Sequence, residues 1–360
     1  MSPISGRPAL LYWEGLVLKR KLLGVIDATT YHEDLEDLLT HRSLAALPFA
    51  GRYRIIDFVL SNMVNSGIKS VAIFPKMTYR SLMDHLGSGK NWDLNRKRDG
   101  LFFFPTPVVD SDINKIGTFE NFAANLDFFY RSTQEYSIIT NCYTVFNMDF
   151  KPLLKGHIHS GCDITEIFHE NGSPMKMYLV KTSLLINLIE TRNETGYTCM
   201  KDVVLDTEHH YSICTYTYSG YAVMIDSIQK YFSTSLNLLN SEVWKQLFNK
   251  EQPILTKVKD EPPTRYLKGS VVQNAMIANG CLINGSVENS IISRGVKIGK
   301  GAVIKNCIIM QKCVIEDNCY LDSVILDKDV KVEEGTILTG TARDPFVVRK
   351  GTKQGALMNT

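Results

Sequence analysis

The chain has 360 residues, of which 44% are hydrophobic and 22% are charged, and its formal net charge is +2. This length favours two domains over a single core, and the small net charge gives no field that would attract nucleic acid. No apolar stretch approaches the length that spans a bilayer, so neither a nucleic acid nor a membrane is expected as a partner.

Residues 1–20 are interpreted as an N-terminal extension to which no function is assigned. The apolar run from Ala9 to Trp13 is interrupted by Glu14, and the basic residues Lys19 to Lys21 follow the run instead of preceding it. This order differs from that of a secretory signal.

The eight cysteines form no C-x-x-C pair, so zinc and thioredoxin-like sites find no support. Reduced thiols in a cytoplasmic protein are therefore expected.

An α/β domain is predicted over residues 21–260. The apolar run Leu22–Ile26 is followed by polar residues, which is typical of a strand and then a loop. Apolar residues between Ile55 and Ile68 have helical spacing, and Ser70–Phe74 has the character of a buried strand. A further helix over Asn121–Arg131 and a strand over Tyr136–Thr140 continue the alternation. This order predicts a parallel sheet with helices on both faces, in which ligands bind at the carboxyl ends of the strands.

The pattern changes after Pro262–Pro263, where short aliphatic runs alternate with Gly, Asn, Asp and Ser. Ile292, Ile298 and Ile304 step by six residues, which is the hexapeptide signature of a left-handed parallel β-helix. We predict this domain over residues 266–345, followed by a tail over 346–360. Positions six apart are expected to share a side of the triangular coil, and positions eighteen apart are expected to stack. Three cysteines on the same lattice are expected to point into the core: Cys307, Cys313 and Cys319.

The segment Leu47–Phe58, which reads LPFAGRYRIIDF, closely resembles a sequence block of bacterial ADP-glucose pyrophosphorylases, the glucose-1-phosphate adenylyltransferases. The segments Leu60–Asn62 and Asn65–Ile68 continue this block, and Gly117–Thr118 resembles the start of a helix in the same family. The similarity extends over about residues 21–345 and implies a Rossmann-like nucleotidyltransferase domain of the GT-A type before the β-helix. Members join glucose 1-phosphate to ATP, which releases pyrophosphate and yields ADP-glucose for glycogen synthesis.

The family's phosphate-binding loop, GGxGxR, is not preserved. The resemblance aligns it with Thr29–Asp34, which contains no glycine, and Asp34 stands where the family has an arginine. Without glycines the backbone cannot approach the phosphates closely, and Glu33 and Asp34 would repel a triphosphate.

The two aspartates that hold magnesium in the family are also replaced. The resemblance places Cys142–Tyr143 at the first position and Met224 at the second, and neither offers a hard oxygen ligand suited to magnesium. Asp149 lies nearby and is expected to be a structural cap or a solvated residue. No catalytic residue, metal site or cofactor is therefore expected in this chain, and Mg²⁺ is expected only in a catalytic partner.

The sugar-phosphate lysine of the family's "EKP" motif is not found, because the chain passes almost directly from Asn171 through Pro174 into a predicted strand. Lys176 and Lys181 are possible anion partners there. In the family's effector motif Leu44 replaces the lysine, while the arginine is kept as Arg42. Residues that could still bind an effector such as a sugar phosphate are Arg42, Arg52, Arg54 and Arg80.

Preserved sequence blocks combined with replaced functional positions resemble the non-catalytic GlgD-type subunits of these enzymes, which pair with a catalytic subunit. It implies a regulatory or assembly role in a cytoplasmic heterotetramer. Two alternatives remain open at this point. One is an active sugar-nucleotide pyrophosphorylase with displaced ligands. The other is a hexapeptide-repeat acyltransferase, which lacks its histidine base because all eight histidines, ending with His209 and His210, precede the β-helix.

Overall fold

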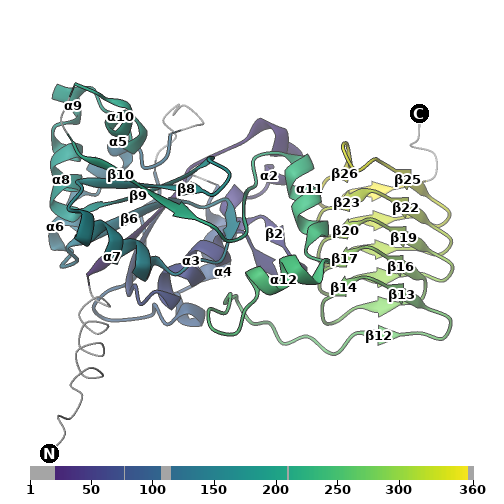
Figure 1. Cartoon of the computed structure of the whole chain (residues 1–360). Coiled ribbons are helices and arrows are strands. Elements are labelled where there is room, and N and C mark those ends of the chain that lie inside the picture. Colours follow the sequence, from purple (N-terminus) through teal and green to yellow (C-terminus); the bar gives the residue numbers. More distant parts are fainter. Residues whose placement is uncertain (1–20, 77, 107–114, 209–210, 356–360) are drawn as a thin grey trace, which may run out of the picture. The chain divides into compact units, whose positions relative to one another are not determined.

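The computed structural model describes residues 21–76, 78–106, 115–208 and 211–355, which divide into two compact units (Figure 1). The sheet unit comprises the chain up to Thr30, Phe58–Ala222 and Lys250–Leu255. The β-helix unit comprises Tyr31–Asp57, Val223–Asn249 and the chain from Thr256 onward. Within the described ranges, none of the helices is both long enough and apolar enough to cross a membrane.

A seven-stranded sheet with the order β10-β8-β9-β6-β1-β4-β5 forms the centre of the sheet unit. Every strand runs parallel to the others except β9, which is antiparallel to both of its neighbours, so the sheet is mixed and not wholly parallel as expected. The strands are β1 (Leu22–Ala28), β4 (Ser70–Pro75), β5 (Gly100–Phe103), β6 (Tyr136–Asn141), β8 (Ile164–His169), β9 (Pro174–Lys181) and β10 (Ile213–Tyr218).

Helices between these strands supply the rest of the core of the sheet unit. The single helix expected over Asn121–Arg131 is two helices, α5 and α6, because the backbone leaves helical geometry at Asn125. Helix α8 contacts β6, β9 and both of these helices. The helices are α3 (Ile56–Asn65), α4 (Arg80–Leu86), α5 (Phe119–Ala123), α6 (Leu126–Arg131), α7 (Phe150–Ser160), α8 (Thr182–Glu190), α9 (Arg192–Thr195) and α10 (Met200–Leu205), with the short strands β7 (Thr144–Phe146) and β11 (Ala222–Met224).

Three parallel sheets form the β-helix, with one short strand per side of each coil (Figure 1). The strands continue to Gln354, which is beyond the expected end at residue 345. The first sheet contains β12 (Arg265–Tyr266), β15 (Leu282–Ile283), β18 (Lys297–Ile298), β21 (Val314–Ile315), β24 (Lys331–Val332) and β27 (Lys353–Gln354). The second contains β13 (Val271–Gln273), β16 (Ser286–Glu288), β19 (Val303–Lys305), β22 (Tyr320–Asp322) and β25 (Ile337–Thr339). The third contains β14 (Met276–Ile277), β17 (Ile291–Ile292), β20 (Ile308–Ile309), β23 (Val324–Leu326) and β26 (Phe346–Val348).

The stacking within the β-helix corrects the expected register. Ile292, Ile298 and Ile304 lie on three successive sides and not on one side. Ile298 stacks on Ile315, seventeen residues further on, whereas Ile277 stacks on Ile292 after fifteen residues and Lys331 on Lys353 after twenty-two, so the spacing is not a uniform eighteen. The corner after the second strand of a coil is turned by a single residue with positive φ, such as Asn289 or Asn306, which shortens the coil. The expected inward cysteines Cys307, Cys313 and Cys319 are confirmed as core residues.

Residues 31–57 and 223–249 belong to the β-helix unit, although the sequence placed them in the first domain. The Tyr231 hydroxyl in α11 (Ile228–Asn237) donates to the carbonyl oxygen of Pro48 in β2 (Pro48–Phe49) at 2.7 Å, and α11 contacts β20. Arg42 forms an ion pair with Asp327. The remaining elements of these two segments are η1 (Glu33–Leu35), α2 (Glu36–Leu39), η2 (Leu44–Ala46), β3 (Tyr53–Arg54) and α12 (Ser241–Leu247).

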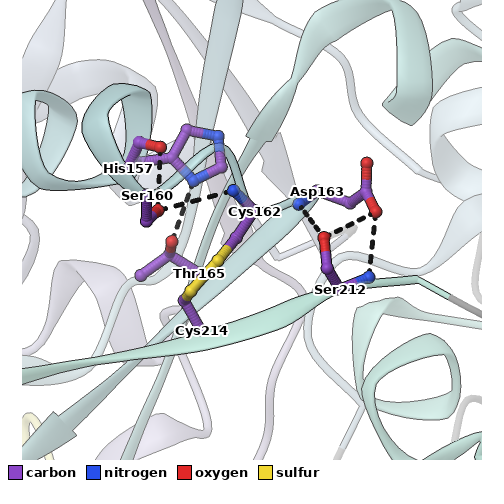
Figure 2. The surroundings of a disulfide bond; sticks show 7 residues. All are labelled: His157, Ser160, Cys162, Asp163, Thr165, Ser212 and Cys214. Atoms are coloured by element: carbon purple, nitrogen blue, oxygen red, sulfur yellow. Dashed lines mark hydrogen bonds between the residues drawn. A yellow bond between two sulfur atoms is a disulfide. The ribbon is translucent and has the colours of Figure 1, made fainter.

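A disulfide between Cys162 and Cys214 contradicts the expectation that all thiols are reduced (Figure 2). The two residues are 52 positions apart in the sequence, and the pairing of β8 with β10 brings them together. The expectation holds for the other six cysteines, which form no disulfide and are buried.

Candidate functional site

The carboxyl end of β1, where the related enzymes have their phosphate loop, is closed by the side chain of Asp27. This residue is 1% exposed, and its carboxylate accepts hydrogen bonds from Thr29 N at 2.9 Å and Gly117 N at 2.7 Å. The Thr29 hydroxyl donates to the same carboxylate at 2.6 Å. Burial raises the pKa of Asp27, and the bonds from Thr29, Gly117 and Thr118 oppose that rise. Backbone amides that could bind an anion are therefore occupied by a carboxylate of the chain itself.

The continuation of the loop contains no compensating cation. Glu33 and Asp34 form the exposed first turn of η1, with no basic residue in its last turn. Asp34 therefore presents a negative charge at the position aligned with the family's arginine.

The first metal position is a closed part of the core. Cys142 and Tyr143 follow β6 and are 0% and 1% exposed. The side chain of Asn141 fixes this turn, because its Oδ1 accepts from Tyr143 N at 3.0 Å and from the Thr144 hydroxyl at 2.8 Å. A bulky aromatic side chain thus fills the position aligned with a magnesium carboxylate.

The second metal position, Met224, lies at the end of β11 and is half-buried. A thioether is a soft and weak ligand that does not suit magnesium. Asp149 is confirmed as a structural residue, because it is the N-cap of α7 and accepts from Lys151 N at 3.0 Å. Over the described residues, no group of three or more His, Cys, Asp or Glu side chains could hold a metal ion. His209 and His210 lie outside these residues.

The sugar-phosphate region is a short hairpin. Strands β8 and β9 pair in antiparallel fashion, and the connection between them is turned by Gly172 with a φ of 83°. Lys176 lies 5.8 Å from the centroid of the Tyr143 ring, and Lys181 is exposed at the end of β9. The hairpin leaves no room for the longer segment that carries the family's lysine.

Arg42 is committed to a buried ion pair within the β-helix unit. One guanidinium nitrogen lies 2.8 and 2.9 Å from the two carboxylate oxygens of Asp327, and the other donates to Leu38 O at 3.0 Å. Both charged side chains are 2% exposed. Arg42 therefore holds the segment before β2 against the β-helix.

Lys328, which follows Asp327, is half-buried beside three other cations: Arg42, Arg54 and Lys350. Burial is the largest cause that lowers the pKa of Lys328 to about 7, and Arg54 and Arg42 lower it further. Asp327 is the carboxylate that opposes this shift, and it already neutralises Arg42. The cations that lower the pKa of Lys328 therefore outweigh the single carboxylate that raises it. Nothing in the sequence placed Lys328 beside Arg54.

The other two predicted effector residues are not among the cations that lower the pKa of Lys328. Arg52 is exposed, with its guanidinium carbon 5.0 Å from the centroid of the Tyr53 ring, and it lies near Arg294. Arg80 is the exposed first residue of α4 in the sheet unit. Of the four predicted residues, the structure brings together Arg42 and Arg54.

Two families of known proteins match the two parts of the chain. Residues 35–176 match the family described as Nucleotidyl transferase, and residues 262–344 match the family described as GlmU-like, C-terminal hexapeptide.

Similar proteins cover almost the whole chain. The glycogen biosynthesis protein GlgD of Bacillus subtilis (strain 168) is 53% identical over 344 residues, which is 96% of this chain and 100% of the relative. The protein of the same name from Geobacillus stearothermophilus is 60% identical over 343 residues, or 95% of this chain and 100% of the relative. Glucose-1-phosphate adenylyltransferase of Bacillus cereus (strain ZK / E33L) is 26% identical over 89% of this chain and 95% of its own. The chain therefore belongs to the GlgD family of glycogen biosynthesis proteins.

Proposed function

We propose that the chain is a regulatory subunit of glucose-1-phosphate adenylyltransferase that lacks catalytic activity of its own. It acts in the cytoplasm by associating with a catalytic subunit in a heterotetramer, and Mg²⁺ is bound by that partner. The observation that carries this proposal is that the backbone amides at the end of β1 already have a partner. The Asp27 carboxylate accepts hydrogen bonds from the amides of Thr29 and Gly117, so a triphosphate would have to displace a buried group of the same charge.

The open end of the β-helix supports association with a similar chain. Val272 begins an inward row that continues through Val287, Ile304 and Leu321, and those three are 0% exposed, whereas Val272 is 39% exposed. In the first sheet Tyr266 begins another row and is 55% exposed, whereas the row ends on the polar Gln354 at the other end. Terminal coils of repeat folds need a polar cap or a partner, because their apolar faces and strand edges are otherwise open to water.

The function is tested by measuring pyrophosphate release with saturating ATP, glucose 1-phosphate and Mg²⁺. The chain alone is expected to give no signal above the reaction without enzyme. Equimolar addition to the catalytic subunit is expected to raise the rate of that subunit, and the two are expected to co-elute from a sizing column. Release by the isolated chain would instead support an active enzyme with displaced ligands. If the two proteins do not co-elute and the rate of the catalytic subunit does not change, the chain is not its regulatory subunit.

A pair of variants tests whether the open end of the β-helix is the docking surface. Val272→Asp places a charge on the first coil and is expected to abolish both co-elution and the rate increase. Lys297→Asp changes an exposed side chain on an inner coil and is expected to preserve both. Equal behaviour of the two variants would place the docking surface elsewhere.

We further propose that the cluster around Lys328 binds the anionic group of an effector, with Arg54 and Lys350 as its other cations and Arg42 held by Asp327. Because the pKa of Lys328 is about 7, raising the pH through 7 removes its charge in the free protein. Sulfate is a suitable probe because its own charge does not change over this range. Its affinity is expected to fall by up to about tenfold per pH unit above 7.

Calorimetric titration with sulfate between pH 6 and pH 9 checks this expectation, with those limits chosen about one to two units either side of the lysine pKa. Lys328→Met is expected to bind weakly at all pH values, with most of the pH dependence lost. Lys297→Met, an exposed lysine of an inner coil, is the matched control and is expected to behave as the unchanged chain. An affinity that is independent of pH in the unchanged chain would contradict the assignment.

A further inference from the structure

Two of the eight cysteines differ from the others in exposure and partner. Cys162 and Cys214 are half-buried and form a disulfide with each other, whereas the remaining six are buried and form no disulfide. Burial raises the pKa of the Cys307 and Cys313 thiols to about 12, so they are neutral and unreactive in the β-helix core. Thiol chemistry is therefore confined to the half-buried pair.

The pair joins two segments that are adjacent only in the folded sheet. Cys162 follows Gly161, which ends α7, and Cys214 is the second residue of β10. Their Cα atoms are 6.0 Å apart, within the range in which a disulfide forms without movement of the backbone. Breaking and re-forming the bond therefore requires no refolding of either segment.

Strand β10 is the strand for which a covalent bond matters most. It is an outer strand of the sheet and pairs with β8 on one side. Its residues alternate between exposed and half-buried, and Ile213 is 37% exposed, whereas β1, β4 and β6 are buried throughout. A strand with so few buried contacts is expected to open locally at a lower free energy than the rest of the sheet.

Polar contacts accompany the disulfide at the start of β10 (Figure 2). The Asp163 carboxylate accepts from Ser212 N at 2.9 Å and from the Ser212 hydroxyl at 2.8 Å, and these bonds lower the pKa of Asp163. Ser212 is exposed, so water can replace these bonds when the strand opens. The far end of the strand is held separately, by the bond from the Tyr218 hydroxyl to Asn147 O at 2.7 Å.

We propose that Cys162 and Cys214 form a reversible thiol–disulfide site that fixes the start of β10 when oxidised and releases it when reduced. A low-molecular-weight disulfide is the oxidant. The two thiols lose two protons and two electrons and become one disulfide, and the oxidant becomes two thiols. Reduction by two equivalents of a small thiol reverses each step. A reversible pair is compatible with the reducing cytoplasm, because the pair rests there as two thiols and forms the disulfide only when it is oxidised.

The test uses the full chain equilibrated in buffers of reduced and oxidised glutathione. Alkylation followed by peptide mass spectrometry is expected to show Cys162 and Cys214 changing together, with no disulfide forming among the other six. Hydrogen exchange of the amides of residues 213–218 is expected to be faster in the reduced chain by at least about tenfold, while β1 is unchanged. A pair that stays reduced in excess oxidised glutathione, or exchange in β10 that ignores the redox state, would overturn the proposal.

Two variants separate the covalent bond from its surroundings. In the double variant C162S/C214S, exchange in β10 is expected to match the reduced chain under both conditions. Asp163→Asn removes the charge and so weakens the polar contact beside the bond, but it keeps both cysteines, so its exchange is expected to remain redox-dependent. Loss of that dependence in Asp163→Asn would contradict the assignment to the thiols. The comparison of the reduced with the oxidised unchanged chain decides the question even where a variant does not fold.

Discussion

Replacing Arg42 with alanine is expected to lower the free energy of unfolding by about 3–5 kcal/mol, because it leaves the Asp327 carboxylate buried without a countercharge. Both side chains of the pair are 2% exposed, and the guanidinium also caps Leu38 O. Urea unfolding followed by tryptophan fluorescence and circular dichroism measures the change. A loss of this size would alter the fold as well as any bound anion, so Arg42 is unsuitable as a probe of effector binding.

Two controls accompany this prediction. Arg349→Ala removes an ion pair with Asp37 in which the side chains of Arg349 and Asp37 are 63% and 37% exposed. This substitution is expected to lower the free energy of unfolding by no more than about 1 kcal/mol. Arg42→Met combined with Asp327→Leu removes both charges at once and is expected to recover most of the stability. A loss for Arg42→Ala no greater than that for Arg349→Ala would show that the buried pair is not a structural link.

Replacing Asp27 with alanine is expected to lower the free energy of unfolding by about 2–4 kcal/mol. The side chain accepts from Gly117 N, Thr29 N and the Thr29 hydroxyl, and a buried donor without an acceptor costs about 1–3 kcal/mol. Asp27→Asn keeps one acceptor oxygen, but its NH₂ group replaces the second oxygen and faces a backbone or hydroxyl donor. This variant is therefore expected to be more stable than Asp27→Ala but less stable than the unchanged chain. The same urea experiment measures both variants.

The exposed carboxylate of Asp34 is the matched control, because it lies a few residues further along the same loop. Asp34→Ala is expected to change the free energy of unfolding by less than about 0.5 kcal/mol. An unchanged free energy of unfolding for Asp27→Ala would mean that water replaces the carboxylate. The backbone amides at the end of β1 would then be able to bind an anion.

The alternation of strands and helices in the sheet unit could be predicted from the apolar runs, but the ends of the strands could not. The apolar run ends at Ile26, whereas β1 continues to Ala28 and buries Asp27. A polar residue marks the end of a strand in the sequence, and only the distant amide of Gly117 makes its burial favourable. Likewise, the hexad period predicts three sheets, but the single-residue corners at Asn289 and Asn306 set the register.

The positions that the resemblance aligns with the family's metal ligands could be located in the sequence because each lies beside a preserved block. The capping role of Asp149 is as expected, whereas the burial of Tyr143 was not predicted. Lys328 and the bond between Cys162 and Cys214 could not be predicted, because their partners are distant in the sequence. The disulfide depends on the pairing of β8 with β10, and the low pKa of Lys328 depends on its burial beside Arg54.

The carboxylate at the end of β1 also bears on how the lineage could change. A mutation that removes Asp27 leaves buried hydrogen-bond donors without an acceptor. If glycines are introduced into the following loop while Asp27 remains, its negative charge still repels a phosphate. Under the proposed function, neither change alone opens this end of β1 to an anion, so both would have to occur together before the chain could hold a triphosphate there.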